Sequence, residues 1–207
     1  MLKNFIIPGI IVAGCDEAGR GCLAGPVFAA AVILPLDYSH PFLNDSKQLT
    51  LKQRNLLRIE IEREALDYRV GIADTTEIDR FNIANASYLA VHRAIEKLKP
   101  SPGHILMDGN RFKPYHDIPH TCVVKGDATW LNIAAASVIA KTYRDEYMLT
   151  LHTKFPEYGW DRNKGYPTLQ HRKAIILHGL TPHHRRTFRQ INSQLELPFV
   201  TRTGSVS

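Results

Sequence analysis

Four acidic residues stand at the ends of short apolar runs, with glycines close by. Hard divalent cations such as Mg²⁺ take oxygen ligands, chiefly carboxylates, water and substrate phosphate. Any one of these acids alone would be an ordinary solvated loop residue, but three such strand-end motifs in one chain indicate a metal site. The four acids are Asp16, Glu17, Asp108 and Asp127.

The apolar runs that precede these acids are short and rich in Val and Ile, which predicts buried strands. The expected strands are 10–15, 27–34, 67–74, 104–107 and 121–124. Helical spacing of apolar residues and capping residues predict helices between and after them. The expected helices are one that begins after Thr50, and 75–99, 130–154 and 168–178. Strands and helices in this order predict an α/β fold on a mixed sheet.

The segment 16–25 lies between the first two expected strands and is predicted to be a loop or bulge at the end of the sheet. Successive side chains of a strand point to opposite faces. Adjacent acids such as Asp16 and Glu17 therefore need a twist or bulge before both can address one site, and the glycines that follow would permit it.

The string Asp-Glu-Ala-Gly-Arg-Gly at 16–21 resembles the signature of ribonuclease HII, the type 2 ribonuclease H. Further strings match in the family's order from about residue 10 to residue 188, and together they are highly specific. They are Asp45-Ser46-Lys47, Met107-Asp108-Gly109, Val124-Lys125-Gly126-Asp127, the helix 133–141 with Arg144-Asp145, Asn163–Thr168 and His184–Phe188. Small departures are Cys22, where the family more often has proline, and Thr187, where serine is commoner.

This resemblance implies an RNase H-like fold, a mixed five-stranded sheet flanked by helices, with a small helical C-terminal region. It also implies that Asp16, Glu17, Asp108 and Asp127 are the catalytic acids and hold two Mg²⁺ or Mn²⁺ ions. The implied activity is hydrolysis of the RNA strand of RNA:DNA hybrids and nicking 5′ of single ribonucleotides in duplex DNA. The products would carry 3′-hydroxyl and 5′-phosphate ends.

The family resemblance also assigns residues that read the substrate. A protein distinguishes RNA from DNA at one position by contacting a 2′-hydroxyl. The main chain of Gly19-Arg20-Gly21 matches the family's ribose-reading loop, with the Arg20 side chain left to meet phosphate. Tyr166 matches the tyrosine that packs against the neighbouring sugar, and Lys47 becomes a contact to the nucleic-acid backbone.

The net charge of +6 is concentrated in one part of the chain. Segment 151–190 holds eight basic and two acidic residues, whereas the charges of the rest of the chain balance. We expect this basic run to position a duplex through its phosphates. The expected division is a catalytic core at 1–150, a basic helical region at 151–192 and a flexible tail at 193–207.

The tail carries Gln-Leu-Glu-Leu-Pro-Phe at 194–199, which resembles the short motif that docks bacterial DNA-processing proteins on the sliding clamp. The docking residues would be Gln194, Leu195, Leu197 and Phe199. A frayed amphipathic tail is an equally good interpretation of the same hexapeptide.

Three cysteines, an odd number, suggest reduced thiols in the cytoplasm. No apolar run approaches the roughly 20 residues that cross a bilayer, so we expect no membrane contact, and we expect a monomer. Two alternatives stay open: a non-catalytic nucleic-acid binding module, and an exported lipoprotein processed before Cys15. Among the histidines, His184 is a minor active-site candidate, and Asp145 is expected to be structural.

Overall fold

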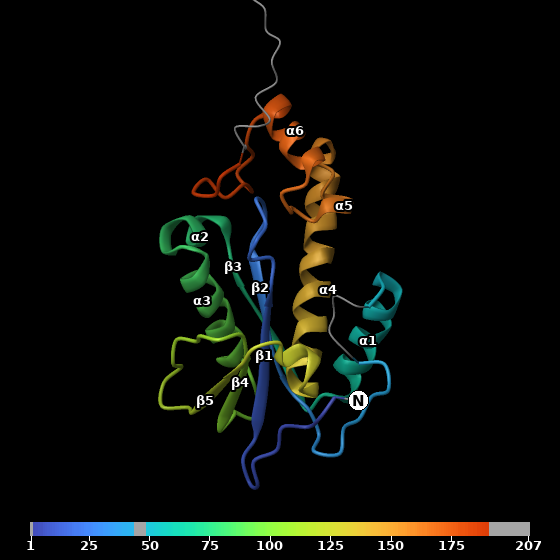
Figure 1. Cartoon of the computed structure of the whole chain (residues 1–207), viewed down its shortest axis with the longest axis vertical. Helices are drawn as coiled ribbons and strands as arrows, with labels where there is room; N and C mark the ends of the chain where they lie inside the picture. Colours follow the sequence, from blue (N-terminus) through green and yellow to red (C-terminus); the bar gives the residue numbers. More distant parts are fainter. Residues whose placement is uncertain (1, 44–48, 191–207) are drawn as a thin grey trace, which may run out of the picture.

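The computed structural model describes residues 2–43 and 49–190, and a five-stranded sheet forms its centre (Figure 1). The strands lie in the order β3-β2-β1-β4-β5. The central strand β1 pairs antiparallel with β2 and parallel with β4, so the sheet is mixed, as predicted. The strands are β1 (Val12–Ala18), β2 (Val27–Ile33), β3 (Asp67–Ala73), β4 (His104–Asp108) and β5 (His120–Val123).

Helices cover both faces of this sheet. In Figure 1, α2 and α3 lie on one face, and α4 with α1 lies on the other. Small helices α5 and α6 pack at the far end of α4, above the ends of β1 and β2. The helices are α1 (Leu51–Glu64), α2 (Thr75–Phe81), α3 (Ile83–Ile95), α4 (Leu131–Lys154), α5 (Trp160–Asn163) and α6 (Leu169–His178), with 3₁₀ turns η1 (Gly126–Ala128) and η2 (Pro156–Tyr158). No helix within the described ranges combines the length and apolar character that a membrane span requires.

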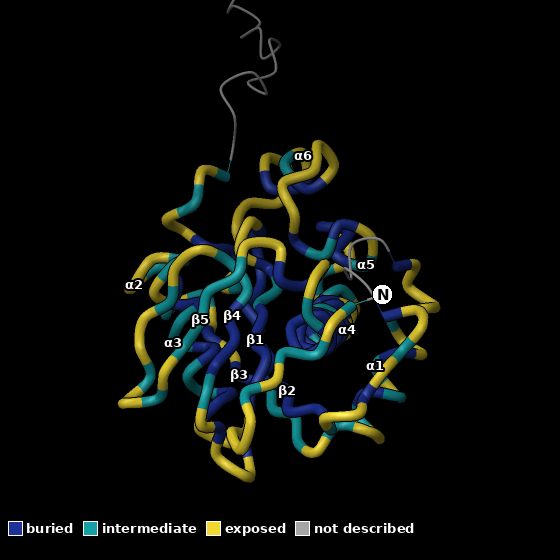
Figure 2. The backbone as a smooth tube through the Cα atoms, turned by 60° about the horizontal axis from the view of Figure 1, so that its bottom comes forward, coloured by how far each residue is buried: buried dark blue, intermediate teal, exposed yellow. Residues whose placement is uncertain are grey.

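Strand β2 shows how one segment serves two cores. Its residues alternate between the faces, with Ala29 and Ala31 packed toward α3 and Ala30 and Val32 packed toward α1 and α4. All seven residues of β2 are buried. Alanine on both faces allows the helices to approach the sheet closely, and α4 is accordingly buried along most of its length (Figure 2).

The single helix predicted over 75–99 is wrong, because the segment forms two helices. The break falls at Asn82, which ends α2 and caps α3 with a positive φ of 68°. Its side-chain oxygen accepts hydrogen bonds from the backbone N–H groups of Ala84 and Asn85. Asparagine is a preferred N-cap, and these two hydrogen bonds help to hold its positive φ.

The prediction that residue 16 begins a loop is also wrong. Strand β1 continues regularly to Ala18, and Asp16 and Glu17 pair with Ala30 and Ala29 of β2. The long partner strand β2 supplies hydrogen bonds for this extension, which the local sequence of β1 does not reveal. The turn begins only at Gly19, whose φ is +94°.

The C-terminal part of the described chain packs on the end of α4 and on the turn after β1. Leu23 and Ala24 of that turn share a buried cluster with Met148 of α4 and with Tyr158 and Trp160. Helix α4 itself runs continuously through residue 150. The division at that residue stays a prediction.

Candidate active site

Two of the predicted acids lie side by side at the ends of neighbouring parallel strands. Cys15 of β1 pairs with Met107 of β4, so the next residues along, Asp16 and Asp108, are adjacent in the sheet. Strand alternation turns both away from the α3 core, toward α4. On this side the Ser137 hydroxyl of α4 forms a hydrogen bond with the Asp16 carboxyl.

The third acid, Asp127, is brought to the same edge by a tight turn. Lys125 adopts a left-handed conformation with φ 56°, and the 3₁₀ turn η1 then carries Asp127 into a buried position. The N–H of Gly126 donates a 2.7 Å hydrogen bond to Oδ1 of Asp108. A Cβ at Gly126 would overlap the end of the Ile133 side chain of α4, so this close approach favours glycine. Asp108 and the Asp127 turn are therefore joined directly.

The fourth acid, Glu17, follows Asp16 in a regular strand and points to the other face of the sheet. It lines a hollow of about 330 Å³ together with Arg20, Tyr88 and Asp108. Its Oε1 accepts a 2.8 Å hydrogen bond from Arg20 Nη1. Arg20 is therefore paired with Glu17 in this structure, whereas the prediction left its side chain free to meet phosphate. The Arg20 side chain is half exposed, whereas the Glu17 side chain is 9% exposed, so only the arginine side of this ion pair is open to solvent.

Negative charge accumulates at this edge of the sheet. Burial, followed by the charges of Glu17 and Asp108, raises the pKa of Asp16 well above its ordinary value. Hydrogen bonds from Ser137 and from the Glu17 backbone N–H act in the opposite direction but do not offset the repulsion. A carboxyl group whose pKa is raised by neighbouring carboxylates, as that of Asp16 is, marks a place that a cation would stabilise.

The fit of these residues to a metal ion is a matter of donor chemistry. All four are carboxylates, the donors that Mg²⁺ and Mn²⁺ prefer. Within the part of the chain that the structure describes, no three His, Cys, Asp or Glu groups are already arranged to hold a metal ion. Strand alternation turns Glu17 away from Asp16. The oxygen donors fit a hard divalent cation, but within the described residues three of them do not yet converge on one position.

The turn after β1 is supported from beneath by two buried arginines. Arg185 donates to the carbonyl oxygens of Gly19, Arg20 and Gly25 at 2.6, 2.8 and 3.0 Å. Arg144 of α4 lies directly under Gly19, where a Cβ would overlap its Nε. The predicted ribose-reading loop, Gly19-Arg20-Gly21, is thus a held turn beside the acids. By contrast, a Cβ at Gly21 would meet nothing within 4 Å.

Tyr166 lies in a second loop that is fastened to this turn. The backbone N–H of Leu23 donates a 2.8 Å hydrogen bond to the carbonyl of Gly165. The Tyr166 hydroxyl forms a side-chain hydrogen bond with the Cys22 thiol, and burial raises the pKa of both groups. Tyr166 is 40% exposed, so it offers ring surface to a ligand while its hydroxyl is held.

The basic segment does not act as one surface. Arg185 is fully buried, which corrects the prediction that it contacts a duplex. The sequence reasoning missed this role and that of Arg144; the only signal was their place within the family strings. The basic residues of segment 151–190 that are exposed are Lys154, Arg162, Lys173, Arg186 and Arg189.

His184 lies in the interior and not among the acids. Its Nε2 lies 3.2 Å from Nε2 of His171, which accepts a 3.0 Å hydrogen bond from the Trp160 indole. Burial and the neighbouring histidines lower the pKa of His184 to about 4, so it is neutral near pH 7. Asp145 is also buried and pairs with Lys141 of the same helix, the structural role expected of it.

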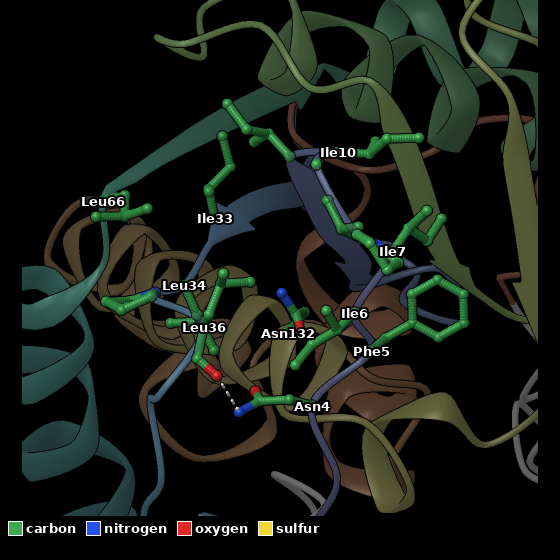
Figure 3. A pocket seen from close by; sticks show the side chains of 15 residues that line it. Asn4, Phe5, Ile6, Ile7, Ile10, Ile33, Leu34, Leu36, Leu66 and Asn132 are labelled. Atoms are coloured by element: carbon green, nitrogen blue, oxygen red, sulfur yellow. Dashed lines mark hydrogen bonds between the residues drawn. The ribbon is translucent and has the colours of Figure 1, made fainter.

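Two groups of predicted residues lie outside the described ranges: Lys47, and the tail residues Gln194, Leu195, Leu197 and Phe199. A different hollow, apolar and about 260 Å³ in volume, lies at the opposite end of β1 from the acids. Figure 3 shows Asn132 among its aliphatic side chains, which include Ile6 and Leu36. It contains none of the predicted site residues.

Solved structures with a similar backbone identify the class of this fold. The crystal structure of ribonuclease H2 from Pyrococcus horikoshii matches with a TM-score of 0.74 at 27% identity and covers 86% of this chain and 94% of that one. Ribonuclease HII of Archaeoglobus fulgidus in complex with PCNA matches with a TM-score of 0.73 at 24% identity, covering 90% and 98%. Bst-RNase HIII in complex with Mn²⁺ matches with a TM-score of 0.64 at 18% identity and covers 87% of this chain and 68% of that one. The fold and its row of strand-end acids define an RNase H-like nuclease.

Sequence comparison gives the particular family. The family model described as Ribonuclease HII matches residues 13–191. Ribonuclease HII of Phocaeicola vulgatus is 60% identical over 201 residues, covering 96% of this chain and all of the relative. That of Bacteroides fragilis is 61% identical over 198 residues, covering 95% and 98%. The chain belongs to the ribonuclease HII family, and it is a metal-dependent endoribonuclease of the ribonuclease H type.

Proposed function

We propose that this enzyme hydrolyses the RNA strand of RNA:DNA hybrids and also nicks duplex DNA on the 5′ side of a single embedded ribonucleotide. The products carry 3′-hydroxyl and 5′-phosphate ends. Removal of misplaced ribonucleotides from DNA in the cytoplasm is the corresponding role, and the three free cysteines agree with a reducing compartment. Family membership supports the hybrid as substrate.

The observation that carries this proposal is the mutual repulsion of the strand-end acids. Asp16 is buried beside Glu17 and Asp108, and the charges of both raise its pKa. Such a cluster is costly to the fold unless it serves to bind positive charge. It lies beside the glycine-flanked turn 19–21. The acids would bind the metal ions at a phosphodiester, and the backbone N–H groups of the turn would donate hydrogen bonds to the same substrate.

Asp16, Glu17, Asp108 and Asp127 would hold the divalent metal ions, Mg²⁺ or Mn²⁺. Two such ions, when bound, supply an activated water nucleophile and stabilise the charge that develops on the leaving oxygen. The side chains themselves bind and orient: Ser137 fixes Asp16, and the N–H of Gly126 fixes Asp108. The Mn²⁺ bound by the ribonuclease HIII of similar fold supports this assignment.

The substrate would be read at the sugar and held at the phosphates. The main chain of Gly19, Arg20 and Gly21 meets the 2′-hydroxyl, because no Cβ intervenes at either glycine. The Tyr166 ring packs on the neighbouring sugar. Arg20 exchanges its exposed pairing with Glu17 for a phosphate, and Lys47 with the exposed basic residues of 151–190 holds the duplex.

A nicking assay tests the proposal directly. Purified protein with Mg²⁺ or Mn²⁺ is mixed with a labelled duplex that contains one ribonucleotide, with an RNA:DNA hybrid and with an all-DNA duplex. We expect cleavage of the first two only, with a 3′-hydroxyl that a polymerase can extend. Salt-sensitive hybrid binding without cleavage from neutral to alkaline pH would instead establish a non-catalytic binding module.

We further propose that Gln194, Leu195, Leu197 and Phe199 dock on the bacterial sliding clamp. The archaeal relative solved in complex with PCNA supports a clamp as the partner. A chain ending at residue 193 should lose clamp binding and keep its nicking rate. Clamp affinity equal to that of the full chain would refute the docking motif.

A further inference from the structure

Two arginine side chains are buried beneath the turn 19–26 in an unusual way. Arg144 and Arg185 are 1% and 0% exposed. Arg185 binds three carbonyl groups of the turn, and Arg144 binds those of Ala24 and Pro26 and reaches Lys164 in the loop that carries Tyr166. Every one of these hydrogen bonds, within the residues described, ends on a main-chain oxygen.

This arrangement is costly for a structure that needs only stability. A buried charge is expensive unless it is paired, and hydrogen bonds to neutral carbonyls compensate it only in part. Burial lowers the pKa of Arg185 to about 10, which still leaves the guanidinium charged at neutral pH. The cost is concentrated at a turn that adjoins the acids, which indicates that the shape of this turn matters.

The contacts of Arg185 fix which polar groups the turn exposes. The carbonyl oxygens of Gly19 and Arg20 both point inward to the guanidinium. In a trans peptide the N–H points opposite to the carbonyl of the same unit. The N–H groups of Arg20 and Gly21 therefore point outward, away from Arg185, and nothing fills the space around the Gly21 Cα.

We infer that Arg185 is a positioning residue for ribonucleotide recognition: by holding the Gly19 and Arg20 carbonyls inward, it presents the Arg20 and Gly21 N–H groups as donors to the 2′-oxygen. The inference rests on the proposed function, because it concerns the same loop. Arg144 fastens the Tyr166 loop to this turn, so both sugar contacts share one support. Arg185 itself touches no substrate.

The test compares two variants that weaken the same buried layer. Arg185→Lys keeps the positive charge but cannot span three carbonyl groups. Trp160→Phe, the matched control, removes the indole hydrogen bond to His171 and involves none of the hydrogen bonds from Arg144 and Arg185 to the turn. For each protein, dissociation constants are measured in Ca²⁺ for a duplex with one ribonucleotide and for the same all-DNA duplex, with gels confirming uncut substrate.

We expect the wild-type protein to prefer the ribonucleotide duplex, and Arg185→Lys to lose at least about tenfold of that preference. In Mg²⁺ the variant should show a raised KM with a smaller change in kcat. Trp160→Phe should keep the preference within about twofold while its melting temperature falls. An unchanged preference in folded Arg185→Lys, or an equal loss in Trp160→Phe, overturns the inference.

A measurement on the wild-type protein covers the case in which Arg185→Lys does not fold. Amide NMR shifts of Arg20 and Gly21 should change with the ribonucleotide duplex and not with the all-DNA duplex. Shifts that are the same for both duplexes overturn the inference. A wild-type protein that neither prefers nor cleaves the ribonucleotide duplex contradicts the proposed function itself, so the two failures are distinguishable.

Discussion

Charged groups are arranged differently in two regions of the molecule. One is the acid edge of the sheet, formed by Asp16, Glu17, Asp108 and Asp127. The other is the buried layer beneath the turn 19–26, formed by Arg144, Arg185, His171 and His184. At the acid edge, carboxylates lie close enough to raise the pKa of Asp16. In the buried layer, Arg144 and Arg185 donate to carbonyl groups, and burial together with neighbouring positive groups lowers the pKa of His171 and His184. At the acid edge the carboxylate charges repel one another, whereas in the buried layer each arginine is partly compensated by main-chain carbonyl oxygens.

This difference separates binding from positioning. Repulsion that the fold does not relieve is available to a ligand of opposite charge, whose binding then gains the energy. Polar groups that are already compensated have nothing left to offer a ligand and can only hold something in place. The acid edge is accordingly the part of the site for which we propose the chemistry, and the buried layer holds the turn that adjoins it.

Asp108→Asn should have the largest effect and should affect only function. Asparagine can still accept the hydrogen bond from the Gly126 N–H, and it removes a charge that repels Asp16. We expect nicking to fall by at least about a thousandfold, while the free energy of unfolding stays equal or rises. Activity assays and chemical denaturation check the two parts. Retained nicking would remove Asp108 from the metal site.

Gly19→Ala should destabilise the packing of the turn 19–26 on Arg144, and its effect should be the second largest. Its φ of +94° is strained for alanine, and the new Cβ would overlap the Arg144 guanidinium. We expect a loss of about 2–4 kcal/mol in unfolding free energy. Denaturant titration measures it, and a loss under about 0.5 kcal/mol would show that Arg144 moves aside freely.

Gly21→Ala is the matched comparison within the same turn. A Cβ here meets no other atom, so stability should change by less than about 0.5 kcal/mol. Any loss of ribonucleotide cleavage then reflects the methyl group meeting the substrate. Full activity in Gly21→Ala would place the sugar elsewhere.

Lowering the pH should change the stability contributions of the two regions in opposite directions. His184 has its pKa lowered to about 4 when folded, so the unfolded chain binds more protons below its ordinary value near 6.5. This group alone costs at most about 2 kcal/mol of stability between pH 7 and pH 5. Asp16, whose folded pKa is raised, takes up protons in the folded state and acts in the opposite direction.

Thermal melts at pH 7 and pH 5 check this pair of signs. The drop in melting temperature should be smaller in His184→Gln than in the wild-type protein and larger in Asp16→Asn. Equal drops in all three proteins would show that neither group controls the acid response. The smallest effects are expected here because both groups contribute only part of the total titration.

The sequence predicted what short-range pattern determines and missed what distant contacts determine. Asp108 was predicted at a strand end, because an apolar run followed by Asp-Gly is a local signal. The extension of β1 through Glu17 depends on pairing with β2, so it was missed. The break at Asn82 has a local cause, yet the apolar spacing runs across it and hides it.

The buried arginines were the hardest to predict. Arg185 binds carbonyls of residues more than 150 positions earlier, and no composition or periodicity carries that information. Its neighbour Arg186 is exposed, so side-chain type alone cannot tell the two apart. The family string at 184–188 marked the place but suggested a surface contact, because most arginines are found at the surface.

Helix α4 sets a fixed spacing between the two regions. Ser137, which bonds Asp16, and Arg144, which bonds the turn, are seven residues apart, about two helical turns or 10 Å along one face. Inserting or deleting one residue between them would rotate one contact about 100° away from the other. Insertions that loops accept are therefore excluded from this stretch, and the distance from the proposed metal site to the proposed sugar-reading turn is set by the pitch of a single helix.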